Sequence, residues 1–198
     1  MAEVKRYQTP VFRVSFPELA EAKAFNNGEP KFGLSAVWTP AKFTDKEKEL
    51  WKAIGAALDA ESKERFKVAF KDLPANIKRG IRDGAEKANM EGYGAGTKFA
   101  SLTTKMRPGV VDKDKAPIPV EALKEAIYPG CYCRATVTTY SYDRNGGKGV
   151  ALGLMNVQKV ADGGRLDSRT DAAEDFEDDV DSAFLEQDEG SVEDDPLA

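Results

Sequence analysis

Residues 128–160 (YPGCYCRATVTTYSYDRNGGKGVALGLMNVQKV) constrain the fold most, because they form two β-like runs joined by a glycine-rich turn. In the first run, the odd positions of residues 131–141 are mostly small or apolar. The even positions include three tyrosines and one arginine, namely Tyr132, Arg134, Tyr140 and Tyr142. Since side chains alternate across a strand, the pattern predicts a long hairpin with one face in a core and an aromatic, cationic face outside.

The second run of the hairpin has a face that carries almost no bulk. At residues 149–154 (GVALGL), valine and leucine alternate with glycine and alanine, so a flat group can approach the backbone on the small side. Aromatic rings and cations beside such a surface suit stacked nucleobases and their phosphates. The alternative is that the tyrosines only pair with one another across the strands, as tyrosines commonly do. The hairpin alone does not distinguish the two interpretations.

Three further strands and a short helix are predicted outside the hairpin. Alternating apolar residues indicate strands at residues 10–16, 31–38 and 97–105. Pro119 suits the first position of a helix over residues 119–127. Five strands with a helix between the third and the fourth is the order of the oligonucleotide/oligosaccharide-binding (OB) fold. The predicted fold class is therefore mainly β with a helical insertion: a five-stranded OB-fold barrel plus a disordered acidic C-terminal tail.

The helical insertion is predicted between the second and third strands, at about residues 44–90. It begins with a capping box at residues 44–47 (TDKE), and apolar residues follow at helical spacing in residues 50–58 and 66–73. The same spacing predicts a third helix over residues 77–88. The other side of this third helix carries three cations, Lys78, Arg79 and Arg82. These cations either contact phosphate or form a solvated face.

Charge divides the chain into two parts. Residues 1–161 contain 27 Lys and Arg against 19 Asp and Glu, a net charge of +8, whereas residues 162–198 contain 2 against 15, a net charge of −13. Low hydrophobicity and many carboxylates predict that residues 162–198 are disordered. We therefore expect a basic domain at residues 1–161 and an acidic tail at residues 162–198.

The composition excludes several functions. The chain has no histidine, which removes the usual general base, Ser-His-Asp triads and zinc-histidine sites, and it has no phosphate-binding loop. The carboxylates of the basic domain are scattered, so we expect neither an enzyme, such as a metal-dependent nuclease, nor a cofactor. Cys131 and Cys133 are two residues apart on one strand, which favours reduced core thiols over a disulfide or a zinc site. No apolar run suggests a membrane span or a signal peptide, so we expect a cytoplasmic protein.

Longer motifs resemble a family of phage-encoded single-stranded-DNA-binding proteins with an OB-fold core, long catalogued only as a domain of unknown function. The motifs are residues 107–112 (RPGVVD), residues 129–132 (PGCY) and residues 149–160 (GVALGLMNVQKV) followed by residues 162–163 (DG). The resemblance implies that the chain coats single-stranded DNA during phage replication in the host cytoplasm. It also implies that the acidic tail contacts other replication or recombination proteins.

The hairpin pattern and the tail suggest which residues make these contacts. The predicted DNA-binding residues are Tyr132, Arg134, Tyr140, Tyr142, Arg144, Lys148, Lys98 and Lys105. The predicted partner-binding residues of the tail are Phe176, Phe184, Leu185, Asp194, Asp195 and Leu197. The alternative function is a protein-interaction scaffold or nucleic-acid mimic without DNA binding of its own. The sequence leaves open whether the chain forms a homo-oligomer.

Overall fold

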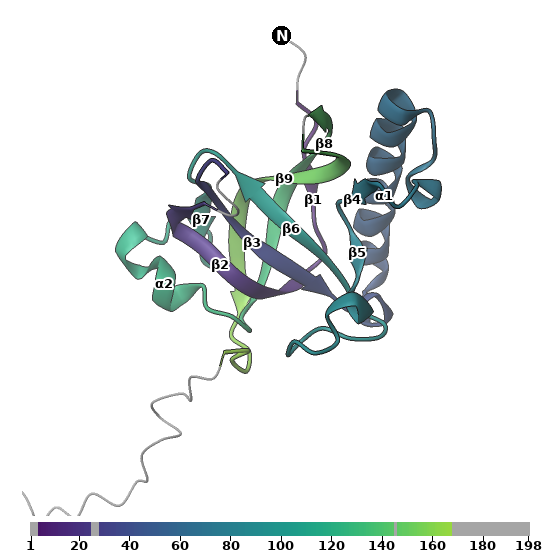
Figure 1. The fold of residues 1–198 in the computed structure, drawn as a ribbon. Coiled ribbons are helices and arrows are strands. Elements are labelled where there is room, and N and C mark those ends of the chain that lie inside the picture. The colour runs from purple at the N-terminus through teal and green to yellow at the C-terminus, as the bar shows by residue number, and fades with distance from the viewer. Residues whose placement is uncertain (1–3, 25–27, 145, 168–198) are drawn as a thin grey trace, which may run out of the picture. The chain divides into compact units, whose positions relative to one another are not determined.

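A computed structural model describes residues 4–24, 28–144 and 146–167 of the chain. This part is mainly β-sheet with one long helix (Figure 1). Five strands form its centre: β2 (Phe12–Lys23), β3 (Lys31–Trp38), β6 (Lys98–Thr104), β8 (Tyr132–Arg144) and β9 (Gly147–Ala161). They pair in the order β2–β3–β6–β9–β8, and β8 pairs with β2 again, so the strands close into a ring.

The ring resembles the OB-fold expected from the strand order. Its pairs are antiparallel except for β6 and β9, which run parallel. Between β6 and β8 the chain forms β7 (Gly109–Val111), a 3₁₀ turn at Val120–Ala122 and the short helix α2 (Leu123–Ala126). A two-residue strand, β1 (Tyr7–Gln8), pairs with β8 next to the residues that pair with β2. The helix thus lies between the third and fourth strands of the ring, as predicted.

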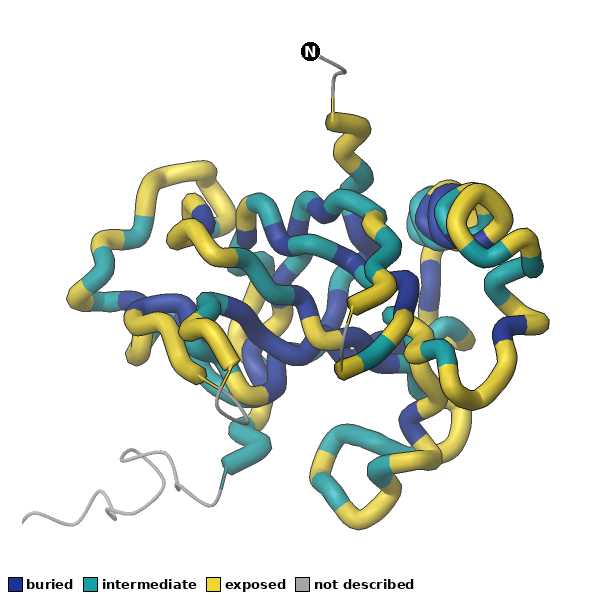
Figure 2. The backbone as a smooth tube through the Cα atoms, turned by 45° about the horizontal axis from the view of Figure 1, so that its top comes forward, coloured by how far each residue is buried: buried dark blue, intermediate teal, exposed yellow. Residues whose placement is uncertain are grey.

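The long hairpin of β8 and β9 has the two faces that the sequence predicted. Its register runs from Tyr132 opposite Ala161 to Arg144 opposite Gly147, with two bulges. The odd positions at the start of β8 are buried, together with the leucines of β9, and buried residues follow the ring strands (Figure 2). Cys131 and Cys133 are free, buried thiols in this core. The even positions of β8 are half-buried or exposed.

Helix α1 (Asp45–Phe66) begins at the predicted capping box. Thr44 Oγ accepts from the Glu47 amide at 3.3 Å, and Glu47 Oε2 accepts from the Thr44 amide at 3.0 Å. Glu47 also accepts from the Val11 amide at 3.0 Å, which joins the helix start to the chain just before β2. The helix ends at Phe66, where the next residue, Lys67, adopts the left-handed conformation (φ 59°). The second helical segment predicted over residues 66–73 is therefore wrong, and only a 3₁₀ turn at Phe70–Asp72 forms there. No helix of the described ranges has the length and hydropathy needed to span a bilayer.

The third helix predicted over residues 77–88 is wrong. Two short strands, β4 (Ile77–Arg79) and β5 (Arg82–Asp83), replace it, followed by a 3₁₀ turn at Gly84–Lys87; 3₁₀ turns also occur at Pro40–Lys42 and Phe70–Asp72. The reason lies in the ring: within the described chain, the β6–β9 register contains a single pair, so both strands leave backbone groups free. β4 pairs with β9 and β5 pairs with β6, so residues 77–83 bridge this seam. Backbone pairing outweighs the weak helical periodicity of the segment.

The compact unit ends at Asp167, whereas the sequence analysis placed the boundary at residue 161. Tyr128 Oη donates to Asp162 Oδ1 at 3.1 Å and accepts from the Gly163 amide at 3.1 Å. The Leu166 amide donates to the Pro129 carbonyl at 2.9 Å. These contacts hold the first residues of the acidic segment against the ring. The predicted partner-binding residues of the tail lie outside the described residues.

Candidate nucleic-acid interface

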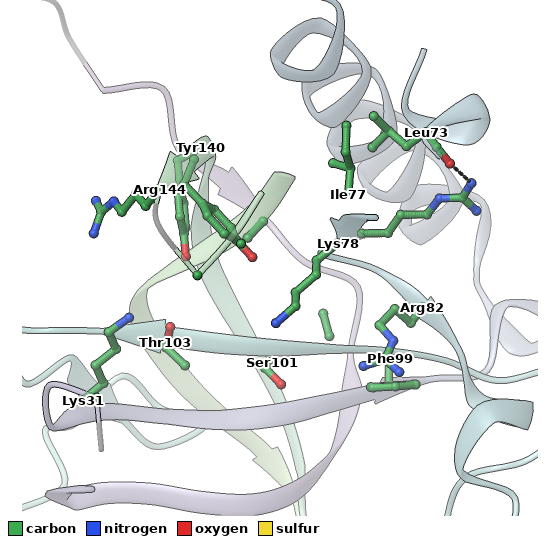
Figure 3. A pocket seen from close by; sticks show the side chains of 18 of the residues that line it. Lys31, Leu73, Ile77, Lys78, Arg82, Phe99, Ser101, Thr103, Tyr140 and Arg144 are labelled. Carbon is green, nitrogen blue, oxygen red and sulfur yellow. Dashed lines mark hydrogen bonds between the residues drawn. The ribbon is translucent and has the colours of Figure 1, made fainter. Parts of the chain in front are cut away.

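A groove of about 1340 Å³ lies where residues 77–83 bridge β6 and β9 (Figure 3). Its walls come from the start of β3, the bridging segment, β6, and the turn end of the β8–β9 hairpin. Tyr140 and Arg144 lie at one end, Arg82 and Phe99 lie at the other, and Lys78 points into the space between them (Figure 3). The volume exceeds the roughly 300–1,000 Å³ of a typical small-molecule pocket, so the groove suits a larger ligand.

One wall of the groove is aromatic. Tyr140 is 38% exposed, and its ring centroid lies 6.1 Å from that of Tyr142. The small face of β9 positions these rings: a β-carbon added to Gly149 would lie 2.6 Å from Tyr142 Oη, and one added to Gly153 would lie 3.7 Å from the Tyr140 ring. The protein's own tyrosines therefore fill the space beside the small residues of β9, where a flat ligand was expected. The small residues determine where the two rings lie. Burial first, and then the nearby Tyr142, raise the pKa of Tyr140, so its ring stays neutral at physiological pH.

The opposite wall is cationic. Among the described residues that line the groove, six are basic and one is acidic, Glu86. Lys78, Arg79 and Arg82 lie on the bridging segment, whereas Arg144 lies beside Tyr140 (Figure 3). Lys31 begins β3, and Lys105, just after β6, forms an ion pair with Glu29. Arg79 donates to the Leu73 carbonyl at 2.7 Å, which fixes its guanidinium at the edge of the bridging segment. Arg82 Nε donates to Glu86 Oε2 at 2.9 Å. This excess of positive charge gives the groove a potential that attracts anions.

The floor of the groove comes from β6. Phe99, Ser101 and Thr103 alternate with the core residues Ala100 and Leu102, so they face the groove rather than the inside of the ring. Phe99 is 2% exposed, because its ring is covered by the Arg82 guanidinium, at 5.0 Å from the centroid, together with Lys87 and Tyr93. The floor therefore combines small hydroxyl side chains with an aromatic ring capped by a cation.

Four of the eight residues predicted to contact DNA meet in this groove: Tyr140, Tyr142, Arg144 and Lys105. The lining does not include Tyr132, Arg134, Lys98 or Lys148. Tyr132 begins β8, at the other end of the strand from Tyr140. Arg134 donates to a glutamine side chain of β9 at 2.8 Å, and Lys98 and Lys148 each pair with an aspartate, at 2.8 and 3.2 Å. The even face of β8 is thus too long to form one site.

The remaining groove residues are not among those predicted from the sequence to contact DNA. The sequence pattern predicts Lys78, Arg79 and Arg82 on one side of a helix, whereas the structure places them on the strands β4 and β5. Lys31 begins β3 and was not identified as a candidate. The floor could have been predicted from the alternation of residues 97–105, because this alternation places Phe99 on the face opposite the core.

Comparison with known proteins gives one family. The sequence matches the family described as the single-stranded-DNA-binding protein of Enterobacter phage Enc34 over residues 5–187. It is also 34% identical, over 155 residues, to the putative protein p50 of Acyrthosiphon pisum secondary endosymbiont phage 1; the match covers 76% of this chain and 80% of that protein.

Solved structures show the same fold. The single-stranded-DNA-binding protein of bacteriophage Enc34 in complex with single-stranded DNA superposes with a TM-score of 0.69 at 21% identity, covering 82% of this chain and 89% of that one. The single-stranded-DNA-binding protein gp2.5 of bacteriophage T7 superposes with a TM-score of 0.55 at 12% identity, covering 89% and 97%. The ring of strands is thus similar to the fold of a single-stranded-DNA-binding protein with little sequence identity to this chain.

The family consists of binding proteins rather than enzymes, which confirms the expectation that the chain is not an enzyme. The resemblance noted in the sequence motifs is likewise confirmed by the match over residues 5–187. This chain belongs to the family of phage single-stranded-DNA-binding proteins represented by that of phage Enc34.

Proposed function

We propose that the chain binds single-stranded DNA in this groove, without sequence preference, and protects it during phage DNA replication and recombination in the host cytoplasm. Bases stack on Tyr140 and Tyr142, and the cations of the opposite wall neutralise the phosphates. The observation that carries this proposal is that two tyrosine rings face the cations Lys78 and Arg82 across one groove. The phage relatives that bind single-stranded DNA support it.

The two walls recognise different parts of a single strand. Every base has a π-face, so stacking on tyrosine contributes about 1–3 kcal/mol per base whatever the sequence. A duplex hides its base faces inside its own stack and cannot use the tyrosine wall. Phosphate contacts add affinity that depends on salt, because each contact releases bound counterions. An OB module of this kind covers roughly 4–16 nucleotides.

Titration of the full chain with labelled oligonucleotides at several salt concentrations tests the proposal. Fluorescence anisotropy suits this test because Trp38 and Trp51 pack against each other away from the groove, at 5.0 Å between centroids, and do not report on it. We expect tighter binding of single-stranded than of double-stranded DNA, and an affinity that falls steeply with salt. Absence of retained single-stranded DNA at low salt would favour the scaffold or mimic function instead. A parallel titration with RNA of the same sequence measures the contribution of the sugar.

Replacing Lys78 with alanine is expected to flatten the salt dependence. Each phosphate contact on a single strand contributes about 0.7 to the slope of log K against log salt, so the slope should fall by about 0.7. Lys46→Ala is the matched control, since it removes the same charge from an exposed position at the start of α1, outside the groove. Equal slopes for both variants would show that Lys78 acts only through net charge.

The acidic tail is proposed to compete with DNA for the groove. The thirteen side-chain carboxylates of residues 171–198, tethered to a basic domain, reach an effective concentration on the order of millimolar. DNA would displace them and free the tail to contact replication or recombination proteins through Phe176, Phe184, Leu185, Asp194, Asp195 and Leu197.

Deletion of residues 171–198 should raise the affinity for single-stranded DNA, most strongly at low salt. The deletion keeps the contacts of Asp162 and Leu166 with the ring, so the domain keeps its fold. A second variant keeps the full length but changes every Asp and Glu of residues 171–198 to Asn and Gln. It distinguishes the effect of the tail's charge from the effect of its size. Competition by charge requires that both variants gain affinity; no gain in either variant refutes it.

A further inference from the structure

Phe16 combines two unfavourable features at one position of β2. It is 51% exposed, although it is a large apolar side chain, and its backbone has φ 46°, in the left-handed region that bulky residues avoid. It also precedes Pro17, which further restricts the backbone conformations open to it. The register of β2 with β3 shifts between Ser15 and Glu18, so Phe16 lies in a bulge. Bulges and strained residues are concentrated next to functional sites, where they redirect a side chain.

The ring of Phe16 lies near Phe99, which is at one end of the groove. Lys87 connects the two: its Nζ is 5.9 Å from the centroid of Phe16, 5.2 Å from that of Tyr93 and 4.8 Å from that of Phe99. Phe99 forms the floor of the groove, and Glu86, the residue before Lys87, lines it. A single ammonium group therefore links the exposed ring to the floor of the site.

Lys87 is half-buried beside these rings. Burial first, and then the Arg82 guanidinium, lower the pKa of the Lys87 ammonium, while Glu86 raises it. A partly desolvated cation against an aromatic face interacts more strongly than an exposed one. Lys87 thus holds the Phe16 ring from one side and adds positive charge at this end of the groove.

We propose that Phe16 is a further base-stacking position, which takes the base of a nucleotide that leaves the groove past Arg82. The inference rests on the proposed function of the groove. The DNA strand would run from Arg144, across the floor of β6, to the bulge of β2. Because a DNA strand is continuous, the nucleotide after those bound in the groove must lie on the protein surface next to Phe99. That surface offers an exposed aromatic ring with a cation beside it, and rings next to cations suit unpaired bases and their phosphates.

Photochemical crosslinking locates the base directly. Thymidine oligonucleotides of twelve residues, each with one 5-iododeoxyuridine at a different position, are bound to the full chain, irradiated and digested for mass spectrometry. We expect crosslinks to Tyr140 or Tyr142 from positions near one end and crosslinks to Phe16 from positions nearer the other end. Crosslinks to the tyrosines at every position, with none to Phe16, would overturn this inference and leave the groove proposal intact. Absence of binding would count against both.

Affinity measurements provide the second test. Phe16→Ala should weaken binding of the twelve-nucleotide strand by about tenfold, whereas Phe16→Tyr and Phe16→Trp, which keep a stacking ring, should stay within about twofold of the parent chain. All three residues have a β-carbon and share the cost of the left-handed backbone, so differences among them report the ring. Phe16→Leu keeps the apolar bulk without a π-face and should bind like Phe16→Ala. Equal affinities across the four variants, at equal thermal stability, would show that the ring makes no contact with DNA.

Discussion

Replacing Tyr140 and Tyr142 together with alanine is expected to reduce the affinity for single-stranded DNA by about two to four orders of magnitude. Stacking on an aromatic side chain is worth roughly 1–3 kcal/mol per base, and the two rings lie side by side at 6.1 Å. The loss should be similar for all oligonucleotide sequences, because stacking does not read the base edges. Fluorescence anisotropy at fixed salt measures it.

Two controls accompany the double variant. Changing both residues to phenylalanine keeps the rings and should keep most of the affinity, which separates stacking from hydrogen bonding by the hydroxyl groups. Tyr132→Ala removes a tyrosine that is equally exposed, at 39%, but lies outside the groove lining, and it should bind DNA like the parent chain. The reverse result, a loss with Tyr132→Ala and none with the double variant, would place the stacking surface at the other end of β8.

Trp38→Ala is expected to lower the free energy of unfolding by about 3–5 kcal/mol, the range for removing a large aromatic side chain from a core. Trp38 is 0% exposed and packs edge-on against Phe12, at 5.7 Å, and Trp51, at 5.0 Å. It joins the ring to α1, because Trp51 belongs to the helix and Trp38 ends β3. Its indole N–H also donates to the Pro10 carbonyl at 3.2 Å, which the substitution would leave without this partner. Urea denaturation followed by circular dichroism measures the change.

Trp38→Phe provides the comparison for this stability prediction. It keeps most of the buried ring and loses the hydrogen bond to Pro10, so it should cost clearly less than the alanine variant. A decrease of under 1 kcal/mol for Trp38→Ala would mean that α1 and the ring do not depend on this contact. Because whole domains are stable by only about 5–15 kcal/mol, DNA-binding assays of the alanine variant require a check of the folded fraction.

Local patterns in the sequence were sufficient for several elements. The alternation in β8 predicted which residues are buried, because side-chain direction in a strand follows from the backbone alone. The TDKE capping box predicted the start of α1, since both of its hydrogen bonds lie within four residues. The motif runs predicted the family, which the match over residues 5–187 confirms.

The groove depended on contacts that no local pattern contains. The apolar spacing of Ile77 and Ile81 favours a helix, and only the free edges of β6 and β9 make strands of this segment. Gly80 shows how close that contact is, because a β-carbon there would lie 2.7 Å from the Ala151 backbone. Lys78 and Arg82 thereby come to face Tyr140 across the groove (Figure 3).

The sequence by itself thus determined the strands of the ring, the start of the helix, the separation of charge and the family. The tertiary structure decided which half of the tyrosine face belongs to the groove and which cations face it. The physical reason is the distance along the chain over which each interaction acts. Side-chain alternation and capping involve residues close in sequence, whereas the groove forms because the segment around Ile77 pairs with residues around Lys148.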